Sequence, residues 1–108
     1  MKADSFRDFV LGQLVGLEVE CRPMFGGFGL YAGEKIFGII FHGQLFFTTD
    51  HTTRADYLER GLAPFRPNIR QRLKSYYEVP AEVIEDAAEL RQWTQRAIQT
   101  KHGARAKS

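Results

Sequence analysis

The chain has 108 residues, of which 44% are hydrophobic and 26% are charged, so it is long enough to bury one core in one domain spanning residues 1–108. This composition excludes a disordered chain and a low-complexity segment, and no apolar run is long enough to span a membrane. The net charge of +2 indicates no particular partner. The single cysteine, Cys21, cannot form an internal disulfide, so we expect a reducing, cytoplasmic location.

The N-terminal segment predicts a helix and then a short extended piece. Apolar residues recur at helical spacing at the start of the chain, which predicts a helix over about residues 5–16 that ends at Gly16. Apolar and charged residues then alternate over residues 19–22, and this extended piece should end at Pro23.

Three antiparallel strands are expected next, because two pairs of residues have the composition of two-residue hairpin turns. These pairs are Gly33-Glu34 and His42-Gly43, and the glycine of each can adopt a positive φ. His42 is interpreted as a turn residue, since histidine also tolerates positive φ. The predicted strands cover residues 28–32, 35–41 and 44–48.

The two turns also predict which residues lie opposite one another in the sheet. Leu30 should face Phe37, and Gly29 should face Gly38, where the glycines would leave a shallow patch open to a close approach. In this register both sheet faces are apolar, whereas a sheet with one face in water alternates apolar and polar residues. The chain's own helices should cover one face. A second subunit, another domain or a ligand should cover the other, unless the helices wrap both.

The second half of the chain begins with another predicted helix. Asp50 should begin this helix, which runs to about Arg60 with Tyr57 and Leu58 facing inward and Gly61 as its stop. The following residues, 63–67, should form an edge segment, because their prolines lack the backbone donors of a central strand.

The remaining elements complete an α+β fold. A strand is expected over 73–79, a helical turn after Pro80, and a final helix from Asp86 to about Thr100 with Trp93 in its buried stripe and Gly103 as its stop. The order α-β(3)-α-β(2)-α predicts a two-layer sandwich with an antiparallel sheet. Its ordered core should cover about residues 5–100, with a basic tail at 101–108.

Positive charge is concentrated in residues 66–74, which hold four basic residues and no acid: Arg66, Arg70, Arg72 and Lys74. Such a segment can contact phosphate and bind DNA weakly and without sequence preference. It is also typical of a solvated strand edge that resists aggregation, and both interpretations stay open. The neighbouring Tyr76 should face outward, either to stack on a base or a partner side chain or as a strand-favouring aromatic residue.

The sequence has no recognisable catalytic or metal-binding pattern. The histidines and Cys21 lack the spacing of a metal site, so we expect no metal and no other cofactor. Cys21 is interpreted as a structural residue and not as a nucleophile. The glycine-rich run over residues 24–29 precedes a strand instead of a helix, which favours a bulged backbone over a phosphate-binding loop.

Three blocks of residues resemble the TfoX/Sxy N-terminal domain family. The first is RPMFGGFGLY at residues 22–31, and the second runs over residues 37–50. The third is KSYYEVP at residues 74–80, followed by Leu90 and Trp93. The resemblance covers about residues 5–98, which is nearly the whole chain.

This resemblance implies a regulatory function. The family is named for bacterial regulators of natural competence, which assist transcription of DNA-uptake genes. In those regulators the domain precedes a second, helical domain, so this chain resembles a stand-alone first domain. The resemblance also implies a fold of the secretion-chaperone type, which often forms dimers, and it implies no catalytic residues.

We therefore expect a non-enzymatic, homodimeric module of the bacterial cytoplasm that docks a protein partner from the transcription machinery. Partner contacts are expected on the sheet face or in its glycine-rich loop, at Arg22, Met24, Phe25, Gly26, Gly27, Tyr31 and Tyr76. The alternative is a small-ligand-binding domain or enzyme that uses an aromatic pocket between sheet and helices.

Overall fold

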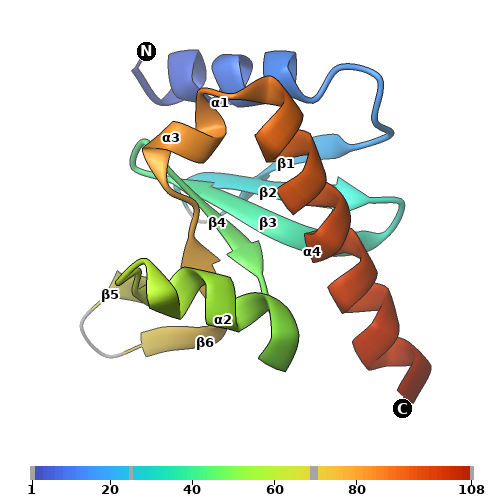
Figure 1. The fold of residues 1–108 in the computed structure, drawn as a ribbon. Coiled ribbons are helices and arrows are strands. Elements are labelled where there is room, and N and C mark those ends of the chain that lie inside the picture. The colour runs from blue at the N-terminus through green and yellow to red at the C-terminus, as the bar shows by residue number, and fades with distance from the viewer. Residues whose placement is uncertain (1, 25, 69–70, 108) are drawn as a thin grey trace.

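Four helices and six strands form two layers in the computed structural model, which describes residues 2–24, 26–68 and 71–107 and the side chains of residues 5–24, 26–66 and 75–100. Helices α1, α3 and α4 lie over one face of the sheet (Figure 1). The elements follow in the order α1 (Lys2–Gln13), β1 (Glu20–Met24), β2 (Gly27–Ala32), β3 (Lys35–Phe41), β4 (Gln44–Thr48), α2 (His51–Glu59), β5 (Pro64–Asn68), β6 (Gln71–Glu78), α3 (Ala81–Ile84) and α4 (Ala87–Lys107).

The sheet confirms the predicted α+β class but contains one strand more than expected. Its strand order is β1-β2-β3-β4-β6-β5, and each neighbouring pair is antiparallel. The extended piece that was expected to end at Pro23 is β1, which pairs with β2 so that Arg22 lies opposite Gly29. A proline is accommodated there because β1 is an edge strand, where a missing backbone donor breaks no ladder.

An extra residue in β3 makes the predicted register between β2 and β3 wrong. Leu30 lies opposite Gly38 and Gly29 lies opposite Ile39, so Phe37 is the residue without a partner in β2. Such a β-bulge shifts the alternation of side chains along the bulged strand. The expected patch between the two glycines is therefore absent, because Gly29 and Gly38 face opposite sides of the sheet. The β3–β4 register is as predicted.

The bulge lets two successive positions of β3 face the helices. Phe37 is fully buried there, and its ring centroid lies 5.8 Å from that of Phe47 on β4. Gly38 faces the same way, since an added Cβ would lie 3.0 Å from the Phe47 ring. A side chain at position 38 has no room beside these two rings, which explains the glycine.

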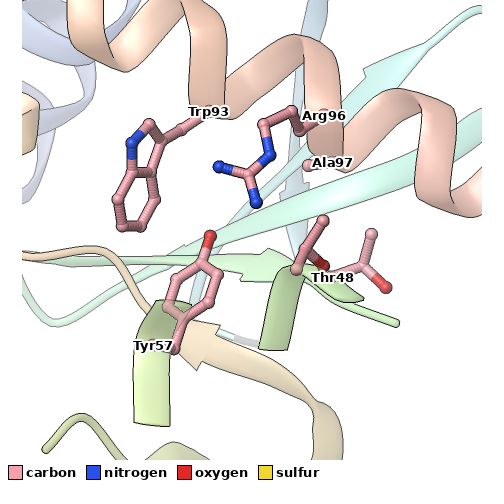
Figure 2. Close-up of a pocket in the computed structure, with 6 residues that line it drawn as sticks. Thr48, Tyr57, Trp93, Arg96 and Ala97 are labelled. Carbon is pink, nitrogen blue, oxygen red and sulfur yellow. The ribbon is translucent and has the colours of Figure 1, made fainter. Parts of the chain in front are cut away.

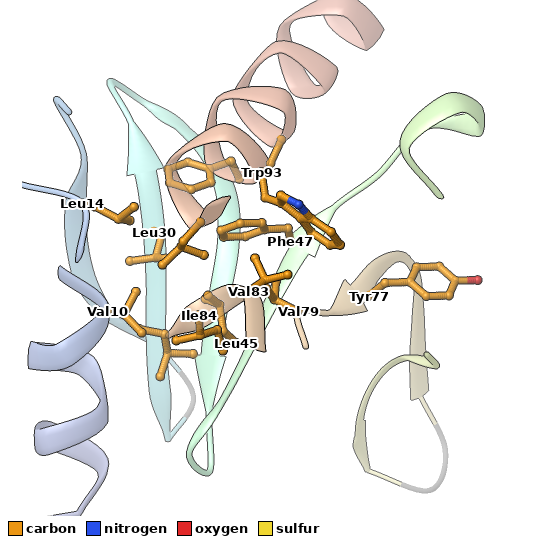
Figure 3. Packing of buried hydrophobic residues seen from close by; sticks show 14 of the residues in the cluster. Val10, Leu14, Leu30, Leu45, Phe47, Tyr77, Val79, Val83, Ile84 and Trp93 are labelled. Carbon is orange, nitrogen blue, oxygen red and sulfur yellow. The ribbon is translucent and has the colours of Figure 1, made fainter. Parts of the chain in front are cut away.

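The main core lies between the sheet and the helices (Figure 3). Each of the four helices contributes at least one buried residue to it. Trp93 belongs to this core and is only 5% exposed, which confirms its predicted place in the buried stripe of α4. The buried members are Val10, Leu14, Leu30, Phe37, Ile40, Leu45, Phe47, Tyr57, Tyr77, Val79, Val83, Ile84, Leu90, Trp93 and Ala97.

A second apolar cluster occupies the opposite face of the sheet. Its buried members are Ile39, Phe46, Phe65 and Tyr76, with Met24, Ile36 and Phe41 packed against them. The Phe65 ring of β5 lies 5.4 Å from the Phe41 ring of β3, centroid to centroid. These strands are three positions apart, or roughly 14 Å in a flat sheet. The sheet therefore curls toward this side, which we call the concave face.

The chain thus covers part of the face that was expected to need an outside cover. Phe65 reaches from the β5 edge onto Phe46, with ring centroids 4.4 Å apart, and Phe46 is only 6% exposed. The helices do not wrap this face, since the β5–β6 end of the sheet provides the cover. Burial of these residues requires no second subunit, and the homodimer remains a prediction.

Two helix ends and the orientation of one side chain differ from those expected. The first helix ends at Gln13, because the next turn tightens through a bond from the Leu14 N–H to the Leu11 carbonyl oxygen at 3.1 Å. Leu58 is 55% exposed, so α2 buries only its Tyr57 side. The last helix continues past Gly103, because glycine in a helix costs only about 1 kcal/mol.

Substitution of Gly38 should distinguish a packing constraint from simple backbone flexibility. We expect Gly38→Ala to lower the free energy of unfolding by about 1–3 kcal/mol, because its Cβ meets the buried Phe47 ring. The matched control is Gly12→Ala in α1, where an added Cβ meets nothing within 4 Å and should stabilise the helix by about 0.5–1 kcal/mol. Urea unfolding of both variants measures this. Equal effects would contradict the proposed contact.

Asp50 should make the stability of the domain depend on pH. Its side chain accepts a hydrogen bond from the Thr53 N–H at 2.9 Å at the start of α2, and this bond lowers the pKa of the carboxyl group. The stabilisation is therefore complete above the unfolded pKa of about 3.9 and is lost as the pH falls through the lower folded pKa. Asp50→Ala should cost about 1 kcal/mol at neutral pH and less in acid.

The control for this prediction is Asp50→Asn, which keeps a capping oxygen but does not titrate. Thermal unfolding of the three proteins across the acid range provides the measurement. A constant difference between the wild type and Asp50→Ala at every pH would show that the charge of this carboxylate plays no part.

Candidate protein-docking face

The concave face opens into a groove near the turn between β3 and β4. The groove has a volume of about 340 Å³. Its floor is formed by aromatic rings of three strands, namely Phe41, Phe46 and Phe65, and its rim includes His42, Arg66 and Glu78. Phe46 and Phe65 are buried while Phe41 is half-buried. The groove therefore presents an apolar floor with a polar rim.

The β3–β4 turn places His42 at the mouth of the groove. His42 has φ 51° and Gly43 has φ 76°, which confirms His42 as a turn residue in a turn with two positive φ values. The imidazole stacks on the Phe41 ring with centroids 4.0 Å apart and is itself exposed. On the neighbouring rim, Gln44 Nε2 donates a hydrogen bond to Glu78 Oε2 at 2.9 Å.

A second part of the same face is a packed patch around Gly29. An added Cβ there would lie 3.0 Å from both Met24 Sδ and the Tyr31 ring, so these side chains close over the glycine. The Arg22 guanidinium lies 4.4 Å from the centroid of the Tyr31 ring and also forms an ion pair with Glu20 at 2.8 Å. This patch offers an exposed cation above an aromatic ring.

The structure thus brings together four of the residues that the sequence proposed for partner contacts. Arg22, Met24 and Tyr31 form the patch around Gly29, and Tyr76 belongs to the apolar cluster of the same face. Tyr76 lies on the side opposite Tyr77, as alternation predicts, but it is only 8% exposed. Burial raises the pKa of its phenol. It is therefore not the outward stacking surface that we expected.

The remaining residues of the glycine-rich loop have structural roles or lie outside the described residues. Gly26 has φ 83° in the β1–β2 turn, a conformation that favours glycine. Gly27 lies so close to the Ile40 carbonyl that a Cβ would collide with it. Phe25 falls outside the described part of the chain. Both glycines are thus required by the backbone itself, whether or not a partner contacts this loop.

The basic segment lies on the β5–β6 hairpin, beside the groove. Arg66 is exposed on β5 and lines the groove. Arg70 lies outside the described residues, and Arg72 and Lys74 belong to β6 with side chains outside the described ones. Arg66 therefore contributes positive charge next to the apolar floor, and the contact of the four basic residues with DNA stays a prediction.

The space between the helices and the sheet is almost completely filled. A crevice of about 10 Å³ lies between α2 and α4, and its lining includes Tyr57, Trp93 and Arg96 (Figure 2). This is room for about one water molecule. Burial raises the pKa of the Tyr57 phenol, which stays protonated, and Arg96 donates a hydrogen bond to Asp56 at 2.6 Å. This crevice is too small for a substrate, and the alternative of a ligand-binding domain or enzyme stays a prediction.

The described residues contain no group of three or more histidine, cysteine and acidic residues that could hold a metal ion. Burial raises the pKa of the Cys21 thiol, which disfavours the nucleophilic thiolate. Among the described helices, none is both long and apolar enough to cross a bilayer. The concave face is thus the candidate site on which the functional argument rests.

The sequence did not predict the groove, because it did not predict the bulge in β3. The predicted register placed Phe41 on the same face as Leu30, whereas the two lie on opposite faces. The available signal was Gly38, since a glycine inside a strand often marks a bulge. No sequence signal indicated that Phe65, between two prolines, would reach across the sheet to Phe41.

The family comparison agrees with this architecture. The model described as the TfoX N-terminal domain matches residues 12–101, a range that contains all six strands of the described sheet. No curated protein matches the chain. Since the match covers most of the chain, this protein belongs to the TfoX N-terminal domain family.

Proposed function

We propose that this domain is a regulatory module that docks a protein partner of the transcription machinery on its concave face. The observation that carries the proposal is the groove, in which the half-buried Phe41 ring lies beneath a polar rim. Grooves of this kind receive apolar side chains of partners, which supply most of the binding energy. Membership in a family named for competence regulators supports a role in transcription and an action in the bacterial cytoplasm.

Non-enzymatic action is part of this proposal. Ligand pockets of enzymes usually enclose about 300–1,000 Å³. The crevice beneath the helices is far smaller than that, and the larger groove is open to solvent. These properties favour a surface that recognises another protein over one that encloses and converts a substrate.

The test is restoration of transcription in the native cell. A deletion strain should regain its wild-type transcript profile with the wild-type gene but not with His42→Asp or Arg66→Glu, which change the charge at the groove rim. Aspartate tolerates the positive φ of position 42, so the turn is preserved. The matched control is Phe9→Ser on α1, where the ring is 47% exposed on the helix layer.

Two results would contradict the proposal. Full restoration by both groove variants would show that the groove is not the docking site. An unchanged transcript profile in the deletion strain itself would remove the regulatory role. Circular dichroism of each purified variant must first confirm that it folds like the wild type.

Direct DNA binding is expected to be weak and secondary. If Arg70, Arg72 and Lys74 each contact one phosphate, log K should fall with log salt with a slope of about −2.7. Titration of labelled duplex DNA at several salt concentrations gives this slope. The absence of binding at low salt, or binding that survives replacement of all three residues by glutamine, would leave the segment as a solvated edge.

A further inference from the structure

We infer that α1 opens as one unit from an otherwise folded domain, and that Arg91 of α4 is the residue that holds it in place. The helix belongs to the layer opposite the concave face, so this inference does not depend on the proposed docking site (Figure 1). Opening removes Val10 and Leu14 from the main core and exposes apolar residues of that core to solvent. The domain thereby has two conformations that differ in the position of one helix.

The side chains of α1 anchor it only lightly to the core. Among the side chains of α1 that the structure describes, Val10 alone is buried, and Leu14 directly after the helix is the second buried anchor. Phe6 and Leu11 are half-buried, while Phe9 is 47% exposed. A helix of 12 residues is too short to be stable in water by itself. The helix therefore keeps its shape only while it is docked.

Arg91 supplies hydrogen bonds that the end of α1 needs. The last carbonyl groups of a helix have no partners within the helix itself. Arg91 Nη1 donates hydrogen bonds to the Val15 carbonyl oxygen at 2.5 Å and to the Gln13 carbonyl oxygen at 3.4 Å. Bonds from a charged donor are stronger than neutral ones, and a cation is favoured at the negative end of the helix dipole. One side chain of α4 thus completes the C-terminal end of α1.

The chain that follows α1 is shaped to admit the guanidinium group. Gly16 has φ 99°, which favours glycine, and an added Cβ there would lie 3.3 Å from Arg91 Nη2. Beside it, Gln13 Nε2 donates a hydrogen bond to the Ile84 carbonyl oxygen of α3 at 2.8 Å. These bonds hold the C-terminal end of α1 against α3 and α4. Loss of Arg91 therefore releases the helix at the end where the chain continues to β1.

The rest of the core has contacts that survive without α1. The Phe37 ring packs against Phe47 within the sheet, and the Tyr57 ring of α2 lies 4.9 Å from Trp93 of α4, centroid to centroid. Neither pair includes a residue of α1. Elements with few buried side chains open at a lower free energy than the core that they cover. Separate opening of α1 is thus favoured over its release only when the whole domain unfolds.

Hydrogen–deuterium exchange of the wild-type protein in increasing urea, followed by mass spectrometry of its peptides, tests the opening itself. Amides of α1 should exchange faster than those of β3 and β4. Their exchange should also depend less on urea, because opening of one helix exposes less surface than global unfolding. Equal rates and equal urea dependence in α1 and in β3–β4 would overturn the inference, since the helix would then leave only with the whole fold.

Variants of two arginines on α4 test the role of Arg91. Arg91→Ala should raise the exchange rate of α1 by at least about tenfold and leave β3 and β4 unchanged, and Arg91→Lys should have a smaller effect because it keeps the charge. The matched control is Arg96→Ala, since Arg96 donates to Asp56 of α2. This variant should not raise the exchange of α1 above that of β3 and β4.

Two results with these variants would overturn the role of Arg91. An equal rise in α1 and in β3–β4 would make Arg91 a residue that stabilises the whole domain. Unchanged exchange of α1 in Arg91→Ala would show that its hydrogen bonds do not hold the helix. If Arg91→Ala does not fold, the urea dependence of the wild type and the exchange of Arg91→Lys decide the inference.

Discussion

The extra residue that β3 carries opposite Leu30 determines which side chains form each of the two apolar clusters. Because Phe37 and Gly38 both face the helices, Ile39 and Phe41 face the other way. Without the bulge, alternation would place these two residues with Leu30 in the main core. The bulge therefore supplies the helix side with a tightly packed core and leaves the opposite side enough apolar residues for a second cluster.

The curl of the sheet converts that second cluster into a recessed surface. A flat six-stranded sheet would leave an apolar face open to water, which favours aggregation. Here the β5–β6 end bends so that Phe65 buries the centre of the face, and prolines in both edge strands remove backbone donors. The result is a small accessible groove in place of a broad apolar face. This limits the number of ways in which another chain can attach.

The two sides of the sheet differ in what they can do. Among the described residues, fifteen buried side chains fill the core on the helix side, and the crevice at Tyr57 is small, so the interactions of this core serve stability. The concave side combines an aromatic floor with Arg66 and His42 at its rim, and the cation Arg22 lies on the Tyr31 ring farther along. The docking proposal therefore rests on this side of the sheet.

The sequence alone determined the elements whose signals are local. Turn glycines positioned the hairpins around His42, the cap at Asp50 began α2, and helical periodicity placed Trp93 in the core. It also determined the family, through motifs spread along nearly the whole chain.

Only the tertiary structure decided the position of the bulge, which depends on how the Phe37 and Phe47 rings share the space at Gly38. The groove followed from it, because the contact of Phe65 with Phe41 joins strands that are neighbours neither in sequence nor in the sheet. No local pattern encodes a contact between such distant strands, since their approach depends on the curl of the whole sheet.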